Sequence, residues 1–256
     1  MGVRELFELG GKVALVTGGS RGLGLQIAQG LGEMGARIAI SARKPAELEE
    51  AKLHLATLGI DAFTVVNDLA QLDQVPKLVE AVVGHYGDIN ILVNNAGTSW
   101  GAPAEQYPLD AWNKVMTLNS TSVFALSQAV ANRCFIPHRS GNIIVIASNA
   151  ALRTSAQMKA AAYYASKAAA LHLTRVLAVE WGPYGIRVNA ICPGFFPSKM
   201  SGALLSRIEG SVIERTPLGR LGRDGDLMGA AIFMASDASR HVTGQYIAVD
   251  GGVSCA

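Results

Sequence analysis

A tyrosine and a lysine four residues apart are the side chains with the clearest chemical potential. Tyr163 and Lys167 lie in a run compatible with a helix, and this spacing is about one helical turn, so the two side chains share a face. A phenol, with a usual pKa of about 10, becomes a proton shuttle near neutral pH when a cation stabilises its phenolate. Lys167 could supply that cation. Because Tyr164 lies three residues from the lysine, spacing alone does not choose between the tyrosines.

A glycine-rich turn after the first apolar run, residues 13–17, could bind phosphate. Glycines let a backbone turn sharply and approach a pyrophosphate, whose charge the N–H groups and dipole of a following helix stabilise. An amphipathic run, 23–34, follows the turn and supplies that helix, although an ordinary strand-to-helix turn remains the alternative. The expected dinucleotide contacts are Gly18, Ser20, Arg21, Gly22, Leu23 and Gly24.

The end of the second apolar run bears on the choice between NAD and NADP. No acidic residue follows it before Glu47, although an Asp or Glu there would bind the free 2′-hydroxyl of NAD. Arg43, with Arg21 and Ser41, instead offers donors to a 2′-phosphate. We therefore expect NADP(H) to be preferred over NAD(H); the alternative is that Arg43 is a solvated residue opening a helix.

Seven short apolar runs alternate with longer amphipathic ones and would position these groups. The runs are nearly continuous in apolar character, which indicates strands buried on both faces, as in a parallel sheet covered by helices. Expected strands are residues 13–17, 37–41, 62–66, 89–94, 142–148, 186–191 and 245–249, and expected helices include 23–34, 45–58 and 75–86. The order predicts one Rossmann-type α/β domain over residues 1–256, a doubly wound sheet of about seven parallel strands with helices on both faces.

Composition narrows the classes of function. The 256 residues are half hydrophobic, and the net charge of +2 offers no broad surface for nucleic acid or an anionic membrane. The three cysteines are widely spaced, none of the five histidines lies in a ligand pattern, and we expect no metal. We find neither a signal peptide nor a membrane span, and expect a cytoplasmic protein whose partner is a small-molecule carbonyl or alcohol.

The stretch 192–223 is the most irregular part of the chain and follows an expected strand. It would lie at the carboxyl edge of the sheet, where ligands of this architecture bind, and we expect it to cover the substrate. Phe195, Phe196 and Met200 could wall an apolar substrate pocket, or they could anchor the stretch to the core.

Several short motifs occur along the chain in a fixed order. They are TGGSRGLG at 17–24, Asn67 to Leu69, NNAG at 94–97, Asn119, Ser148, YYASK at 163–167, IRVNAICPG at 186–194 and VDGG at 249–252. Together they resemble the short-chain dehydrogenase/reductase family over essentially the whole chain. The resemblance implies a nicotinamide-dependent oxidoreductase and selects Tyr163 as the general acid/base, because the family tyrosine precedes the lysine by four residues.

The same resemblance implies the contacts of the cofactor. Asp68 and Leu69 would reach the adenine, and residues Asn95, Ala96 and Gly97 would lie beside the cofactor, although these asparagines could chiefly hold neighbouring strands together. Further along, Pro193, Gly194, Phe196 and Ser198 would line the nicotinamide end, with Ser198 in place of the family's threonine.

For catalysis, the resemblance implies that Ser148 binds the substrate oxygen, alongside Tyr163 and Phe195, and that Asn119 interrupts its helix to hold a water of a proton relay from Lys167. Ser148 lies two residues farther from the tyrosine than the family pattern, so Ser155 is a second candidate. Tyr163 and Lys167 would also contact the cofactor.

Assembly and substrate class also rest on the resemblance. It implies a homotetramer or homodimer in which the helix after Leu109 and the helix of Tyr163 contact partner copies. Members with similar segments act on gluconate-type polyols or reduce 3-oxoacyl thioesters. Alternatives are therefore an NAD-dependent sugar-acid or polyol dehydrogenase of the same family and a non-catalytic nucleotide-binding protein. The substrate, direction and pathway stay open.

Overall fold

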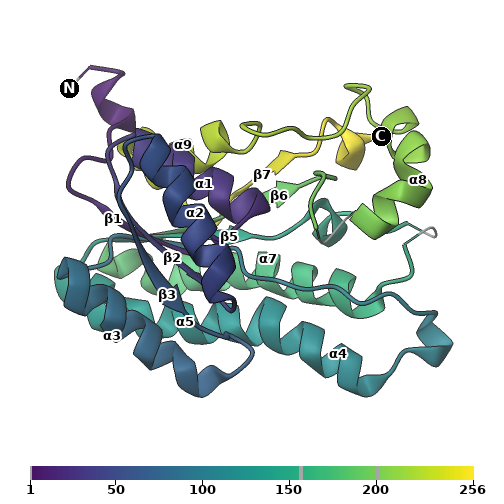
Figure 1. Ribbon diagram of the computed structural model, residues 1–256, viewed down its shortest axis with the longest axis horizontal. Coiled ribbons are helices and arrows are strands. Elements are labelled where there is room, and N and C mark those ends of the chain that lie inside the picture. Colours follow the sequence, from purple (N-terminus) through teal and green to yellow (C-terminus); the bar gives the residue numbers. More distant parts are fainter. Residues whose placement is uncertain (1, 156–157, 200–201) are drawn as a thin grey trace.

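One parallel seven-stranded sheet forms the centre of the computed structural model, which describes residues 2–155, 158–199 and 202–256. The strand order is β3-β2-β1-β4-β5-β6-β7 (Figure 1). The strands are β1 (Val13–Thr17), β2 (Arg37–Ala42), β3 (Ala62–Val66), β4 (Ile91–Asn94), β5 (Gly141–Ile146), β6 (Ile186–Pro193) and β7 (Tyr246–Val249). This confirms the Rossmann-type fold expected from the alternating runs.

Helices cover both faces of the sheet (Figure 1). They are α1 (Gly22–Glu33), α2 (Pro45–Thr57), α3 (Val75–Tyr86), α4 (Leu109–Met116), α5 (Ser122–Val130), α6 (Ile136–His138), α7 (Ala161–Trp181), α8 (Gly202–Glu214) and α9 (Met228–Ala235). Helices α1, α2 and α9 supply the core on one face, and α3, α5 and α7 supply it on the other.

The alternation of side chains along each strand explains why the apolar runs are continuous. In β1, Val13 and Leu15 face the core beneath α3, α5 and α7, whereas Ala14 and Val16 face the core beneath α1, α2 and α9. All of β1 is buried because both faces are covered. β5 is likewise buried on both faces, so its apolar run is continuous for the same reason.

Three strand ends differ from the sequence prediction by two residues, and three others differ by one. β4 begins at Ile91, because the side chain of Asn90 accepts the N–H of Val13 at 2.8 Å and caps the neighbouring strand. β5 ends at Ile146, because Ser148 Oγ accepts the N–H of Ala150 at 3.1 Å and turns the chain into a short 3-10 helix. β6 continues to Pro193.

The expected substrate-covering stretch is not a loop throughout. Its first two residues complete β6, and residues Gly202–Glu214 form α8. Leu205 and Val212, seven residues apart on one helical face, are buried, so the helix is amphipathic and packs on the fold. Sequence reading missed α8 because the surrounding glycines and prolines dominate the stretch.

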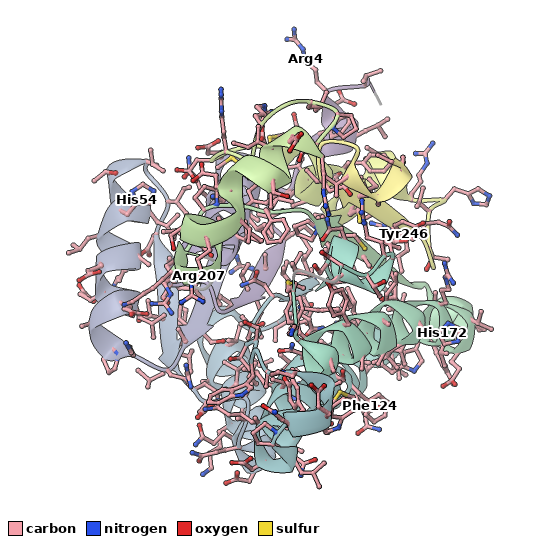
Figure 2. All side chains as sticks on the ribbon, turned by 90° about the vertical axis from the view of Figure 1, so that its right-hand side faces the viewer. Arg4, His54, Phe124, His172, Arg207 and Tyr246 are labelled. Carbon is pink, nitrogen blue, oxygen red and sulfur yellow. The ribbon has the colours of Figure 1, made fainter. Side chains whose placement is uncertain are left out.

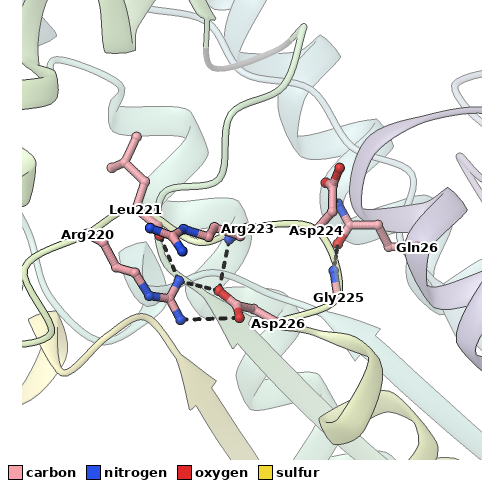
Figure 3. A network of polar contacts seen from close by, with 7 residues as sticks. All are labelled: Gln26, Arg220, Leu221, Arg223, Asp224, Gly225 and Asp226. Carbon is pink, nitrogen blue, oxygen red and sulfur yellow. Dashed lines mark hydrogen bonds and ion pairs between the residues drawn. The ribbon is translucent and has the colours of Figure 1, made fainter.

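A polar network holds residues 220–226, which follow α8 in the chain (Figure 3). Arg220 forms an ion pair with Asp226 at 2.5 Å, and the same carboxylate accepts the N–H of Arg223 at 2.9 Å. From α1, Gln26 donates to Asp224 at 2.6 Å and accepts the N–H of Gly225 at 3.3 Å. The segment is therefore tied to α1, the helix that follows the glycine-rich turn.

Candidate active site

The hydroxyl of Thr17 joins the two central strands at the point where the chain crosses from one half of the sheet to the other. Thr17 Oγ1 donates to the carbonyl of Val93 at 3.2 Å and accepts the N–H groups of Asn95 and Ala96 at 3.0 and 3.1 Å. Asn95 Nδ2 donates back to the carbonyls of Thr17 and Gly18 at 2.8 and 3.2 Å. The strand-holding role of this asparagine is confirmed, while cofactor contact by residues 95–97 stays a prediction.

The glycine turn has no room for side chains where it meets that junction. A Cβ on Gly24 would lie 2.4 Å from the carbonyl oxygen of Gly18, and Gly18 itself has a φ of +63°. Arg21, the N-cap residue of α1, makes no side-chain cap bond, so the N–H groups of the first turn are available to a ligand. Ser198 lies against the turn, 3.9 Å from the Cβ position of Gly22. The turn fits a pyrophosphate.

Beside the turn, Glu47 gathers three cations. Its carboxylate lies 2.8 Å from Arg21, 3.3 Å from Lys44 and 3.5 Å from Lys199. Burial opposes ionisation of Glu47, but these cations outweigh it and lower the pKa of the carboxyl. Lys199 belongs to the substrate-covering segment, so Glu47 links that segment to the glycine turn.

Glu47 also modifies the argument on cofactor preference. The sequence places it too far along to bind the ribose directly after β2, but α2 brings it into contact with Arg21. Arg43 is exposed and no ion pair engages it within the described residues. Ser41 is buried, and its carbonyl accepts the N–H of Gly19 at 3.2 Å. Three cations therefore surround the Glu47 carboxylate at this edge, and Arg43 is not one of them.

At the end of β3, Asp68 is held in place by its neighbours. Its N–H donates to Gln74 Oε1 at 3.0 Å, and its Oδ1 accepts the N–H of Ala70 at 3.1 Å. Leu69, beside it, is buried. Their contact with an adenine stays a prediction.

Lys167 is buried at the floor of the site. Its Nζ donates to the carbonyl of Ile146, at the end of β5, at 2.7 Å. Burial lowers the pKa of Lys167 to about 8. The ammonium lies 5.8 Å from the centre of the Tyr163 ring and 3.6 Å from the Cβ position of Gly97. Lysine, tyrosine and the end of the NNAG motif therefore meet at one edge of the sheet.

Tyr163 faces Ser148, and its electrostatics differ from the sequence prediction. Burial raises the pKa of the Tyr163 phenol, while a hydrogen bond with Ser148 acts in the opposite direction. Lys167 was expected to lower this pKa, but its ammonium is directed to the Ile146 carbonyl instead. The phenol is thus held protonated at neutral pH.

Tertiary contacts separate Tyr163 from its neighbour. The Tyr164 hydroxyl accepts the backbone N–H of Ser155 at 3.0 Å and so holds the loop before α7. Ser148, not Ser155, is the serine that the structure brings to the Tyr163 phenol. The structure assembles Ser148, Tyr163 and Lys167, and their catalytic roles stay predictions.

Asn119 lies in a short π-helix, Thr117–Thr121, between α4 and α5. The helix is widened rather than broken, as is common at functional sites. The buried side chain of Asn119 accepts the N–H of Thr98 and donates to its carbonyl, both at 2.8 Å, and donates to Ser166 Oγ at 3.0 Å. Asn119 therefore fixes the segment after β4 against α7, and its role in a water relay stays a prediction.

The residues after β6 divide between cavity and core. Phe195 lines a cavity together with Tyr164 and the loop that follows Ser148, whereas Phe196 is buried in the core, where its ring fills the space beside Gly222. Of the two alternatives for these phenylalanines, Phe195 fits the wall of a cavity and Phe196 fits the anchor to the core. Gly194 has no room for a Cβ, which would lie 2.8 Å from Asp250 Cα. Met200 lies outside the described residues.

Two arginines that line this cavity were not identified from the sequence. Arg153 comes from the loop before α7, and Arg215 directly follows α8. The signal in the sequence was the spacing of Ile208, Val212 and Arg215, which share a helical face. That spacing becomes informative only once α8 is known to pack over the site.

Within the described residues, no helix is long and apolar enough to cross a membrane, and no cluster of three His, Cys, Asp or Glu residues is placed to hold a metal ion. A glycine turn at the sheet crossover, at the same edge of the sheet as a partly buried tyrosine and a buried lysine, defines the class as a dinucleotide-dependent oxidoreductase.

Comparison with known proteins agrees with this class. Residues 18–254 match the family model described as enoyl-(acyl carrier protein) reductase. A gluconate 5-dehydrogenase of Gluconobacter oxydans is 39% identical over 98% of this chain and 97% of its own length. A rhamnolipid-biosynthesis 3-oxoacyl-[acyl-carrier-protein] reductase of Pseudomonas aeruginosa is 40% identical over 96% of this chain and 97% of its own.

Among solved structures, a gluconate 5-dehydrogenase from Burkholderia cenocepacia, in complex with NADP and tartrate, superposes with a TM-score of 0.94 at 37% identity and covers 100% of both chains. The chain belongs to the short-chain dehydrogenase/reductase family. It is an oxidoreductase that interconverts a carbonyl and an alcohol, as the resemblance implied.

Proposed function

We propose that the protein uses NADP(H) and that Tyr163 exchanges the proton of the reaction. The observation that carries this proposal is the partly buried Tyr163, whose phenol is hydrogen bonded to Ser148 at the carboxyl edge of the sheet beside Lys167. A bound nicotinamide supplies or accepts the hydride, so reduction consumes one hydride and one proton and yields the alcohol.

The residues of the glycine turn fit the dinucleotide. The uncapped first turn of α1, residues 22–24, would bind the pyrophosphate through its N–H groups. Asp68 and Leu69 would hold the adenine, and Asn95, Ala96 and Gly97 would line the adjoining ribose. The expected contacts at the nicotinamide end are Pro193, Gly194, Phe196, Ser198, Tyr163 and Lys167.

The pKa of Tyr163 bears on its role as the proton donor. Because burial raises this pKa, Tyr163 is protonated at neutral pH and ready to donate to the oxygen of a carbonyl. Ser148 orients that oxygen through its hydroxyl. Lys167, buried and linked to the π-helix of Asn119 through α7, would return a proton to the phenolate after donation.

The preference for NADP(H) is supported by charge and by a relative. Arg43 is exposed and without an ion-pair partner among the described residues, and Arg21 and Lys44 lie at the same edge. The Burkholderia cenocepacia enzyme binds NADP. We expect R43Q to lower kcat/KM for NADPH by about tenfold or more, because a charged hydrogen bond is lost. The kcat/KM for NADH should change by no more than about twofold. An equal loss with both cofactors would contradict the role of Arg43.

The proton role is tested with a matched pair of tyrosine variants. Y163F removes the proposed donor, and carbonyl reduction should fall roughly 100- to 10,000-fold while cofactor affinity changes little. Y164F removes a hydroxyl that holds only the Ser155 loop, so kcat should stay within a few fold. Near-normal reduction by Y163F would refute the mechanism.

Two other readings have distinct outcomes. The gluconate relatives favour an NAD-dependent sugar-acid or polyol dehydrogenase as the second candidate, and a clear preference for NADH in the wild type would select it. Tight cofactor binding without turnover of a broad carbonyl and alcohol panel would instead indicate a non-catalytic nucleotide-binding protein.

The protein is further proposed to form a homotetramer or homodimer through the helices named in the sequence analysis. Apolar side chains are exposed on α4, α5 and α7, with Leu109 77% and Val179 79% accessible. Figure 2 shows Phe124 at the surface of α5, below the part of α7 that carries His172. Light scattering that reports a monomer would overturn this proposal, and the cytoplasmic location also stays a prediction.

A further inference from the structure

Glu47, in the first turn of α2, is surrounded by cations from three separate parts of the chain. Its carboxylate lies 2.8 Å from Arg21, 3.3 Å from Lys44 and 3.5 Å from Lys199. The side chain of Glu47 is 19% accessible, whereas those of the three cations are 47% to 67% accessible. The carboxylate is therefore the enclosed member of this cluster, and the cations form its outer side.

Two of these cations lie at the edge where the proposed function puts the 2′-phosphate of NADP(H). Arg21 directly precedes α1, and Lys44 directly precedes α2. Nη1 of Arg21 and Nζ of Lys44 both donate to one oxygen, Oε1 of Glu47. Arg43, beside Lys44, is exposed and has no ion pair within the described residues. Glu47 thus engages two of the three cations that a phosphate would use at this edge and leaves the third free.

We infer that Glu47 limits the preference for NADP(H), because its carboxylate competes with the 2′-phosphate for Arg21 and Lys44. This inference rests on the proposed function and adds to it a residue that determines specificity. A phosphate monoester carries a charge of about −1.5 to −2 near pH 7, so a neighbouring carboxylate repels it. Burial opposes the ionisation of Glu47, but its cations outweigh burial and lower its pKa, so the carboxylate keeps its charge at neutral pH.

The size of the effect follows from the exposure of the cations. An ion pair between exposed side chains changes an equilibrium by up to about fivefold. Replacing Glu47 with glutamine keeps the length of the side chain and frees two such cations, Arg21 and Lys44. E47Q should therefore tighten the binding of a ligand that carries the 2′-phosphate by about three- to tenfold.

Calorimetric titration with two adenosine ligands tests this competition. Adenosine 2′,5′-bisphosphate and adenosine 5′-monophosphate differ only by the 2′-phosphate, so the ratio of their Kd values reports on that group alone. Titrations in about 0.1 M salt screen charges that lie farther than about 10 Å away. We expect E47Q to tighten the bisphosphate as above and to change the Kd of the monophosphate by no more than about twofold. Binding of the monophosphate also shows that the variant is folded.

E49Q is the matched control for charge. Glu49 is exposed on the same helix, two residues after Glu47, so the two side chains point to different sides of α2. No ion pair with Glu49 is present in the part of the chain that the structure describes. E49Q removes the same charge and should leave the ratio of the two Kd values unchanged. Equal tightening of the bisphosphate by E49Q and E47Q would refute the competition, because net charge alone would then account for it.

K199Q separates the carboxylate from its link to the segment after β6. Glu47 also holds Lys199, so E47Q releases that segment as well. K199Q breaks the same contact but keeps the carboxylate, and it should not tighten the bisphosphate. If K199Q tightens the bisphosphate as much as E47Q does, the segment rather than the carboxylate decides the preference, and the inference is wrong.

A direct contact between Glu47 and the ribose is the alternative role. An acid at the end of β2 would bind the 2′-hydroxyl of NAD(H), but Glu47 lies five residues after the last residue of β2 and its carboxylate pairs with cations. Weaker binding of the monophosphate by E47Q would favour this alternative and overturn the inference.

Failure of the inference and failure of the proposed function give different results. A wild type that binds the bisphosphate no more tightly than the monophosphate refutes the preference for NADP(H). The inference then stands if E47Q tightens the bisphosphate alone, and it is refuted if the ratio of the two Kd values is the same in E47Q and the wild type. Binding of neither ligand to any of these proteins would refute both.

Discussion

Replacing Thr17 with valine tests how much of the site depends on one buried hydroxyl. Thr17 is 1% exposed, and its Oγ1 makes three hydrogen bonds, one as donor and two as acceptor of the N–H groups of Asn95 and Ala96. Valine keeps the shape and removes the hydroxyl, which leaves both N–H groups without that acceptor. The N–H of Asn95 keeps a second acceptor, the carbonyl of Val93 at 3.1 Å, so the N–H of Ala96 is the donor left unpaired. An unpaired buried donor costs about 1–3 kcal/mol, so T17V should lower the free energy of unfolding by about 1–3 kcal/mol.

The control for T17V is T174V on α7. Thr174 is also 1% exposed, but its hydroxyl only donates to the carbonyl of Ala170, one turn earlier in the helix, at 3.0 Å. Such a bond is dispensable to the helix, so T174V should change stability by no more than about 1 kcal/mol. Urea unfolding followed by circular dichroism at fixed protein concentration measures both variants. Equal effects of T17V and T174V would refute the reasoning, and T17V should also weaken cofactor binding because it loosens the glycine turn.

Three further predictions follow from glycine packing and from pKa directions. G24A should weaken cofactor binding about tenfold or more, because its Cβ would lie 2.4 Å from the backbone oxygen of Gly18, whereas G84A, with open space around it on α3, should be neutral or stabilising by up to about 1 kcal/mol; calorimetry and urea unfolding measure both. The rate of carbonyl reduction should be constant below pH 8 and fall above it, since the pKa of Lys167 is lowered to about 8, and K167R should remove that fall because arginine stays charged; a profile that is flat to pH 10 would exclude this role. The hydrogen bond with Arg220 lowers the pKa of Asp226, so its stabilisation is present above the unfolded pKa and lost as pH falls through the folded value; the stability gap between wild type and D226N should therefore shrink below about pH 4, and a gap that widens there would contradict it.

The sheet and its first helices followed from the sequence because their signals are local. Continuous apolar runs set all seven strands, and α3 spans residues 75–86 as expected. Helix α8 was missed because prolines and glycines indicate loops there: Pro197 precedes the helix, Gly202 begins it, and Pro217 and Gly219 follow it. Its buried face depends on contacts with the rest of the fold. Local patterns therefore predicted the core better than the segment over the site.

Tertiary contacts, rather than the spacing from the lysine, distinguish the two tyrosines. Spacing placed Tyr163 and Tyr164 on almost the same footing relative to the lysine. In the fold, Ser155 takes the hydroxyl of Tyr164, while Ser148 faces Tyr163. These contacts join residues from a strand end, a loop and a helix, so the spacing of residues within one helix does not predict them.

By itself, the sequence determined the parallel α/β sheet, the glycine turn and the position of the tyrosine and lysine, because each depends on residues close together in the chain. Only the tertiary structure decided that Lys167 binds the Ile146 carbonyl, that Glu47 forms an ion pair with Lys199, and that Arg153 and Arg215 line one cavity. Those pairings depend on long-range packing, which buries charges and sets their partners. The pKa of Tyr163 is raised rather than lowered for the same reason.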